Sequence, residues 1–294
     1  MVMDFIVYIA LLLFGLVLGS FAGASVWRLR ARQLVADKKD GEPFDHDEYK
    51  KLKLLAIQKT SKDHSRCLRC GYMLQWYDLL PLVSWLTLRG KCRRCHHPIG
   101  IMEPLIELAT AAFFVLSYVF WPVQLHSGIH IAEFVIWLVA GVGLTIMFAY
   151  DARWYLLPDK INFPVIGLGL ISASLMVIDS TNNVVGAIFN VLGSVAVLSG
   201  LYYALYIISK GRWIGFGDIK LGLGLGLLLG DWKLALIGLF FANLIGCLIV
   251  IPLMVRGKLT RTSQVPFGPL LIAGVITAKL IGAGIVEFYT LSLM

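Results

Sequence analysis

Long apolar runs separated by short polar segments dominate the pattern of this chain. Runs long enough to cross a bilayer recur eight times, and a helix needs about 20 apolar residues to do so. The pattern therefore predicts an all-α polytopic membrane protein with about eight transmembrane helices. The expected spans are residues 4–26, 101–121, 130–150, 162–178, 184–208, 213–230, 232–255 and 266–290.

One polar segment, residues 28–100, interrupts this pattern. Its first part, about 33–62, is rich in charge and poor in apolar residues, which predicts a mobile loop with one short amphipathic helix. Its second part, 64–100, carries cysteine pairs and should be compact. We therefore expect three regions: a first helix at 1–27, an insertion at 28–100 and a seven-helix domain at 101–294.

Composition and charge support a membrane protein and suggest its orientation. Hydrophobic residues make up 58% of the 294 residues and charged residues only 15%. Residues 28–100 hold a surplus of eight positive charges, as large as the net charge of the chain. Nucleic-acid binding is one explanation, but the positive-inside rule explains the same bias. It predicts that residues 28–100 are cytoplasmic and that both termini lie outside.

Four cysteines form two Cys-x-x-Cys pairs, separated by 21 residues. The pairs are Cys67/Cys70 and Cys92/Cys95. This spacing is typical of a structural zinc site with four thiolate ligands. A reducing cytoplasmic side disfavours disulfides. Unliganded or redox-active thiols are the alternative, and His96 or His97 could replace one cysteine.

Two aspartates at the edges of apolar segments are the candidate catalytic residues. Asp151 follows Tyr150, and Asp218 ends the sequence Gly215-Phe-Gly217-Asp. An ionised carboxylate near the membrane interior is costly and usually functional. Two carboxylates that share one proton form the working state of an aspartyl protease, in which one group activates water and the other donates to the scissile carbonyl.

A structural role for these acids is the alternative. Asp218 could cap a helix, and Asp151 could pair with Arg153 or Lys220. Asp159 precedes the fourth apolar run, so helix capping is its expected role, although it belongs with Lys220 to the motifs around the aspartates. Glu107 lies about one turn into the second run and is a further functional candidate.

Several ordered motifs together resemble the type IV prepilin peptidase family, whose members use a Gly-x-Gly-Asp aspartyl site. The resemblance rests on Gly19-Ser-Phe with Arg28, on both cysteine pairs, and on Pro104-Leu-Ile-Glu107. It also includes the blocks from Asp151 to Asp159 and from Gly215 to Leu221, and Pro266-Phe-Gly-Pro269.

The resemblance implies a multi-pass enzyme of the bacterial cytoplasmic (inner) membrane. Such enzymes remove the short basic leader from prepilin-like proteins of type IV pilus and type II secretion systems, at the cytoplasmic face. It also implies N-methylation of the new N-terminus with S-adenosylmethionine, for which Glu107 and Arg28 are candidates. The expected partners are prepilin or pseudopilin precursors and the lipid bilayer, and not nucleic acid.

The chain departs from the family pattern beside the cysteine-bearing segment. Gly23 stands where asparagine is common, Arg30 where proline is common, and Glu103 where tyrosine is common. The alternative functions are a presenilin-like intramembrane protease, a transporter with intramembrane acids, and a non-catalytic assembly factor.

Overall fold

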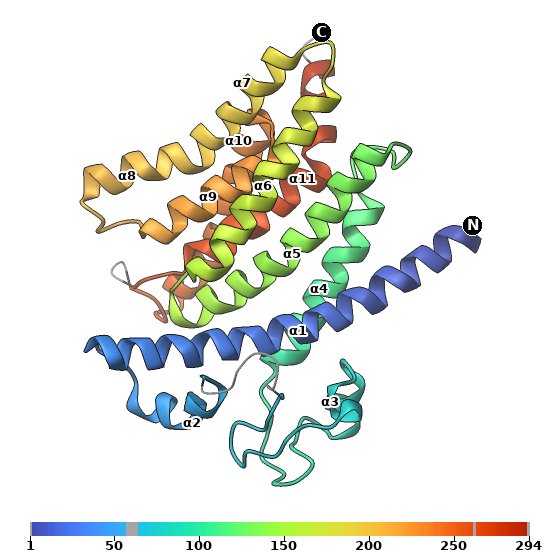
Figure 1. The fold of residues 1–294 in the computed structure, drawn as a ribbon. Helices are drawn as coiled ribbons and strands as arrows, with labels where there is room; N and C mark the ends of the chain where they lie inside the picture. The colour runs from blue at the N-terminus through green and yellow to red at the C-terminus, as the bar shows by residue number, and fades with distance from the viewer. Residues whose placement is uncertain (1, 57–63, 261–262, 293–294) are drawn as a thin grey trace. The chain divides into compact units, whose positions relative to one another are not determined.

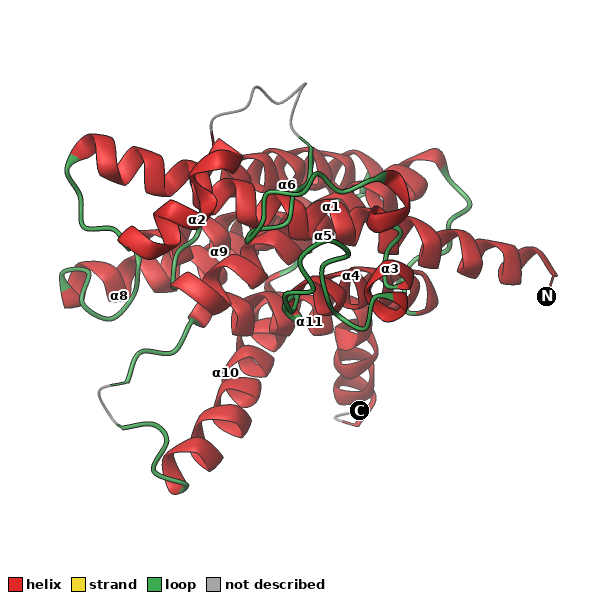
Figure 2. Cartoon of the chain, turned by 90° about the horizontal axis from the view of Figure 1, so that it is seen from below, coloured by secondary structure: helices red, strands yellow, loops and turns green. Residues whose placement is uncertain are grey.

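The computed structural model describes residues 2–56, 64–260 and 263–292. Among these residues the regular elements are helices, and the only pairing of extended backbone consists of two isolated bridges, Arg66 with Met73 and Lys91 with Pro98 (Figure 2). The predicted all-helical class is therefore confirmed. The chain divides into two compact units, Met1–Val115 and Leu116–Met294, which are described separately.

The first unit contains the N-terminal helix and the cysteine-bearing loops. Its helices are α1 (Val2–Asp40), α2 (His46–Ala56), a 3₁₀ turn (Trp76–Leu79), α3 (Val83–Thr87) and most of α4 (Met102–Val119). The short helix expected between 33 and 62 is present as α2. The start of that segment differs from the prediction, because α1 continues without a break to Asp40 (Figure 1). Residues 57–62, which the prediction also covered, lie outside the described part of the chain.

Packing explains why the polar end of α1 is helical. Ala31 and Leu34 of α1 are buried against Leu52 and Leu55 of α2. The guanidinium of Arg30 donates to Glu48 Oε2 at 2.6 Å, and both side chains are largely buried. A proline at position 30 would break this helix, so the arginine found there is compatible with its extension.

The second unit is a bundle of long helices. It contains α5 (Gly128–Trp154), α6 (Asp159–Asp179), α7 (Val184–Val195), a π-helical segment (Ala196–Gly200), α8 (Leu201–Ser209), α9 (Phe216–Leu229), α10 (Trp232–Val255) and α11 (Phe267–Ser292). The end of α5 and the starts of α6, α9 and α11 lie at the same end of this bundle (Figure 1).

Seven helices in the described part of the chain are long and apolar enough to cross a membrane, and α7 and α8 count together as one of them. The remaining predicted span, 213–230, corresponds to α9, which begins at Phe216, three residues later than expected. Its 14 residues are about 21 Å long at 1.5 Å per residue, shorter than a bilayer core of about 30 Å.

Helix α9 is packed within the unit along most of its length. Most of its residues are buried, and α6, α7, α11 and the π-helical segment pack around it. Gly230 ends it in the left-handed conformation, and the Lys279 ammonium group of α11 donates to the Leu228 carbonyl at 3.2 Å. The first turn of α9 is consequently fixed at the end of the bundle where α5 stops.

Candidate active site and metal centre

Asp151 lies one turn before the end of α5 and is almost fully buried, with 5% of its surface exposed. Its Oδ2 accepts a hydrogen bond from the backbone N–H of Gly268 at 3.0 Å. Gly268 belongs to the first turn of α11, where free N–H groups give a helix a partial positive charge. The start of α11 therefore holds the Asp151 carboxyl group in place.

Asp218 is the third residue of α9 and is half-buried. Its Oδ2 accepts the backbone N–H of Gly215 at 3.3 Å. The residue that caps α9 is Gly215 and not Asp218. Asp218 contributes to this helix end only by accepting the Gly215 N–H from the third helical position. The Asp151 and Asp218 carboxyl groups lie within electrostatic range of each other. We call these two residues the aspartate pair.

The residues around the aspartate pair fix the first turn of α9. The Asn162 side-chain amide of α6 donates to the Gly217 carbonyl at 3.3 Å. The Lys220 ammonium group contacts both oxygens of Asp159, at 2.7 and 2.8 Å. Lys220 thus pairs with Asp159 and not with Asp151. Asp159 is not a capping residue, because Pro158 occupies that position and Asp159 lies in the first turn of α6.

This arrangement suits acid–base chemistry on a peptide. Helices whose key residues are 67 positions apart in the chain bring two carboxyl groups to one end of the bundle. Like charges at short range favour a state in which the two groups hold one proton between them. Such a pair can take a proton from water and give another to a carbonyl oxygen.

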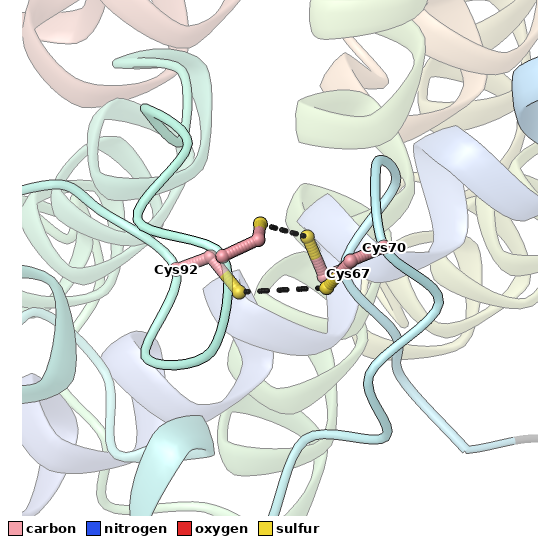
Figure 3. A group of neighbouring side chains, drawn as sticks. Cys67, Cys70 and Cys92 are labelled. Atoms are coloured by element: carbon pink, nitrogen blue, oxygen red, sulfur yellow. Dashed lines mark hydrogen bonds between the residues drawn. The ribbon is translucent and has the colours of Figure 1, made fainter.

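The four cysteines form a second candidate site, in the first unit. Their sulfur atoms all lie within 4.8 Å of one another (Figure 3). In the described part of the chain, these four residues are the group whose side chains are close enough to hold a metal ion. Cys67 and Cys95 are 3.8 Å apart and Cys70 and Cys92 are 4.0 Å apart. Tetrahedral zinc with Zn–S bonds of 2.3 Å needs sulfurs about 3.8 Å apart. The geometry therefore fits zinc. We call these residues the cysteine cluster.

The loops that carry the cysteine cluster repeat one backbone design at an interval of 25 residues. The Cys67 N–H donates to the Tyr72 carbonyl, as the Cys92 N–H does to the His97 carbonyl, each at 2.9 Å. The equivalent turn residues are Gly71 and His96, and both have positive φ. The sequence shows the repeated Cys-x-x-Cys pairs with Arg69 and Arg94 in equivalent positions, but the residues after each pair, Gly71-Tyr72 and His96-His97, differ.

Burial and backbone N–H groups give the thiols of the cysteine cluster different pKa values. Burial raises the pKa of Cys67 to about 12. At Cys92 burial also acts to raise the pKa, but N–H groups of Cys95 and Arg94 and the neighbouring thiols lower it to about 7. Four adjacent thiolates would repel one another strongly, so a cation between them is what would hold all four deprotonated.

Acidic residues of α4 form a third group, also in the first unit. Glu107 is buried and accepts the Leu82 N–H at 2.8 Å, which ties α4 to the loop before α3. One oxygen of Glu103 accepts the Trp27 indole N–H at 3.0 Å, and the other is buried without a hydrogen-bond partner in the described part of the chain. Arg28 lies one residue beyond Trp27 on α1.

Comparison with known proteins identifies the family. A model of the bacterial peptidase A24 N-terminal domain matches residues 13–121, and a model of the type IV leader peptidase family matches residues 138–251. The "Prepilin leader peptidase/N-methyltransferase" of Pseudomonas aeruginosa is 32% identical over 269 residues, which cover 90% of this chain and 87% of that protein. The chain belongs to the type IV leader peptidase family.

Further members have similar identity. The protein of the same description from Dichelobacter nodosus is 31% identical over 90% of this chain and 88% of its own length. The "Type 4 prepilin-like proteins leader peptide-processing enzyme" of Escherichia coli is 31% identical, and 88% of each chain is covered. No solved structure matches the chain.

The sequence did not indicate that Gly268 and Asn162 belong to the site around the aspartate pair. Pro266-Phe-Gly-Pro269 was recognisable as a motif, but nothing in it indicated that the Gly268 N–H donates to Asp151. Asn162 lies among apolar residues and is completely buried. A lone amide in an apolar run was the available signal, because such a group must find a partner.

Proposed function

We propose that this chain is a membrane aspartyl endopeptidase that removes the short basic leader from type IV prepilin or pseudopilin precursors. Membership of the leader peptidase family and the printed names of the relatives support the reaction and the substrate class. The observation that carries the aspartyl mechanism is the approach of Asp151 and Asp218 from separate helices, with Asp151 held by the Gly268 N–H.

In the proposed reaction the aspartate pair holds one proton and a water molecule. The ionised carboxylate takes a proton from water as the water oxygen bonds to the scissile carbonyl carbon. The protonated carboxyl group gives its proton to the carbonyl oxygen, which produces a neutral tetrahedral diol. As the C–N bond breaks, the leaving nitrogen takes the proton of the protonated carboxyl group, and the other carboxylate takes a proton from a hydroxyl of the diol. The leader is released with a new carboxyl end, and the pair again holds one proton.

The proposed location is the bacterial cytoplasmic membrane, with the reaction at the cytoplasmic face. The excess of Lys and Arg in residues 28–100 supports a cytoplasmic position for this segment and outside positions for both termini. The proposed domain organisation remains a first transmembrane segment at 1–27, the insertion at 28–100 and the membrane peptidase domain at 101–294, although helix α1 itself continues to Asp40.

We assign the cysteine cluster to a structural zinc ion. All four tetrahedral positions would be filled by sulfur, which leaves no open position for water or substrate, and a closed site is structural. The ion would join the two loops that start at Cys67 and Cys92, which are otherwise too short to bury a hydrophobic core of their own.

Methylation of the new N-terminus is the second proposed activity, supported by the printed names of the relatives. S-adenosylmethionine supplies a methyl group from a cationic sulfonium, and buried carboxylates favour cations. Glu107 and the unpaired oxygen of Glu103, one helical turn apart on α4, fit such a donor. Arg28 is the further candidate from the sequence.

The test is mass spectrometry of a prepilin-type substrate incubated with the purified full chain in lipid. The wild type should release the leader, and it should add one methyl mass only when S-adenosylmethionine is present. Asp151→Asn and Asp218→Asn should each abolish cleavage. Asp47→Asn is the matched control, because Asp47 is exposed on α2 and makes only a 3.8 Å ion pair with Lys50.

Other outcomes would point to other functions. Full cleavage by either aspartate variant would refute the aspartyl mechanism. A cut within a transmembrane helix of the substrate would favour a presenilin-like protease. Absence of cleavage, together with ion-dependent uptake into vesicles, would favour a transporter.

A further inference from the structure

Tyr202 is a buried polar residue that the proposed mechanism does not use. It lies in the first turn of α8, and only 4% of its surface is exposed. Its ring meets the Phe267 ring edge to face, at 5.1 Å between centroids. In the part of the chain that the structure describes, its hydroxyl has no hydrogen-bond partner.

The π-helical segment before α8 determines where Tyr202 points. The Ser194 hydroxyl donates to the Gly226 carbonyl at 2.8 Å, and the Ser199 hydroxyl donates to the Ile219 carbonyl at 3.0 Å. In an uninterrupted α-helix, residues five apart point about 140° away from each other. The wider turn of the π segment lets both serines face α9. Such segments often occur at functional sites.

Close packing holds this segment in place. A Cβ atom on Gly222 of α9 would overlap the backbone carbonyl of Leu198, so the two helices touch through their main chains. Tyr202 follows Leu198 by four residues and Ser199 by three, and therefore lies on the same side of its helix. That side faces the first turns of α9.

The surroundings of the Tyr202 hydroxyl belong to the aspartate pair. The Asp218 carboxyl group lies within electrostatic range of this hydroxyl. Phe267, which contacts the Tyr202 ring, directly precedes the glycine whose N–H donates to Asp151. The hydroxyl thus lies near Asp218, and the ring that carries it contacts the residue next to the one that holds Asp151.

A buried hydroxyl without a partner destabilises a fold by roughly 1–3 kcal/mol, whereas phenylalanine would fill the same space without this cost. A group that enters the site with the substrate would satisfy the hydroxyl and remove this cost. A peptide bound across the aspartate pair presents such a group, because its backbone carbonyls must give up water on entering the site.

We propose that the Tyr202 hydroxyl donates a hydrogen bond to the substrate carbonyl next to the scissile peptide bond and so holds the leader junction against the aspartate pair. This inference rests on the proposed peptidase function. It makes Tyr202 a substrate-binding residue, while proton transfer stays with Asp151 and Asp218.

The first experiment compares Tyr202→Phe with Tyr203→Phe, using the full chain in lipid and a prepilin-type substrate. Tyr203 is the matched control, because it is adjacent in α8 and half exposed. Tyr202→Phe should keep or raise the melting temperature, while kcat/KM falls roughly 10-fold. Tyr203→Phe should change neither. Full kcat/KM in Tyr202→Phe, or a fall that only follows loss of folded protein, would overturn the proposal.

The second experiment tests the partner of the hydroxyl. A substrate in which an alkene replaces the peptide group next to the scissile bond lacks the accepting carbonyl. Wild type should cleave it roughly 10-fold more slowly than the natural peptide, and Tyr202→Phe should show no such difference. An equal loss in both enzymes would exclude this hydrogen bond.

Asp218→Asn separates the two proposals. Loss of cleavage in Asp218→Asn with full cleavage in Tyr202→Phe would refute only the role of Tyr202. Full cleavage in Asp218→Asn would refute the aspartyl mechanism and the role of Tyr202 with it.

Discussion

The cysteine cluster and the aspartate pair are assembled over different distances along the chain. Each half of the cysteine cluster comes from one tight loop, and both loops use the same backbone hydrogen bonds. The two halves of the aspartate pair come from the end of α5 and the start of α9, and their backbone partners differ. Asp151 depends on Gly268 of α11, whereas Asp218 is held by Gly215 next to its own helix.

This difference separates local from long-range control. A Cys-x-x-Cys loop places its two sulfurs without help from the rest of the fold. The aspartate pair requires that α5, α6, α9 and α11 stop or start at one end of the bundle. A change in the bundle should therefore alter the aspartate pair, while the cysteine cluster should respond mainly to changes in its own loops.

The largest expected effects come from two substitutions that each impair one site and leave the other intact. Asp218→Asn should lower cleavage by about 10³-fold or more, since acid–base groups contribute roughly 10²–10⁴-fold, and it should keep one zinc per chain. Cys67→Ser should lose zinc and loosen residues 64–100, while Leu116–Met294 stays folded. Elemental analysis and limited proteolysis measure these outcomes. Purified wild-type protein without zinc would refute the proposed metal site.

A smaller effect is expected from crowding Asp151. A Cβ atom on Gly268 would lie 2.7 Å from Asp151 Oδ2, so Gly268→Ala must displace the carboxylate. Cleavage should fall by about 10- to 100-fold, since a shift of about 1 Å can have this effect. Gly284→Ala on the same helix is the control, because a Cβ there meets nothing within 4 Å. Equal activity of the two variants would contradict the role of Gly268.

The smallest effects concern the turn residues of the two cysteine loops. Gly71 and His96 occupy equivalent left-handed positions, with φ of 71° and 52°. Gly71→Ala should destabilise its loop by about 1–2 kcal/mol. His96→Gly should change stability by less than about 1 kcal/mol, because relief of strain is offset by the greater freedom of glycine when unfolded. The rate of zinc loss to a chelator measures the stability of each loop. Equal rates in the two variants would contradict the predicted difference between them.

The sequence predicted the parts of the molecule that depend on local pattern. The gathering of the four cysteine sulfurs follows from their spacing, and it is confirmed by the structure. The short helix at His46–Ala56 was expected from the apolar positions around Leu52. The roles of Asp151 and Asp218 as catalytic residues stay predictions, although the structure brings the two side chains near each other.

Long-range packing accounts for what the sequence did not predict. The polar end of α1 is helical because Leu34 packs against α2, which is not visible in residues 28–40 alone. The π-helical segment lies inside a mostly apolar run, and the two serines that it turns toward α9 do not by themselves indicate a wider turn. Asp159 was expected to cap α6, but Pro158 takes that position and Lys220 recruits the carboxylate.

The continuous α1 helix makes a rigid spacer. Its 39 residues extend about 58 Å at 1.5 Å per residue, nearly twice the thickness of a bilayer core. If residues 4–26 cross the bilayer as proposed, the stretch from Arg28 to Asp40 extends about 18 Å beyond it, and α2 packs against this stretch. The direction that the far end of α1 faces depends on the number of residues before it, because each residue turns the helix by about 100°. Removal of one residue from this helix would turn everything beyond it by about 100°, and removal of seven would nearly restore the original direction.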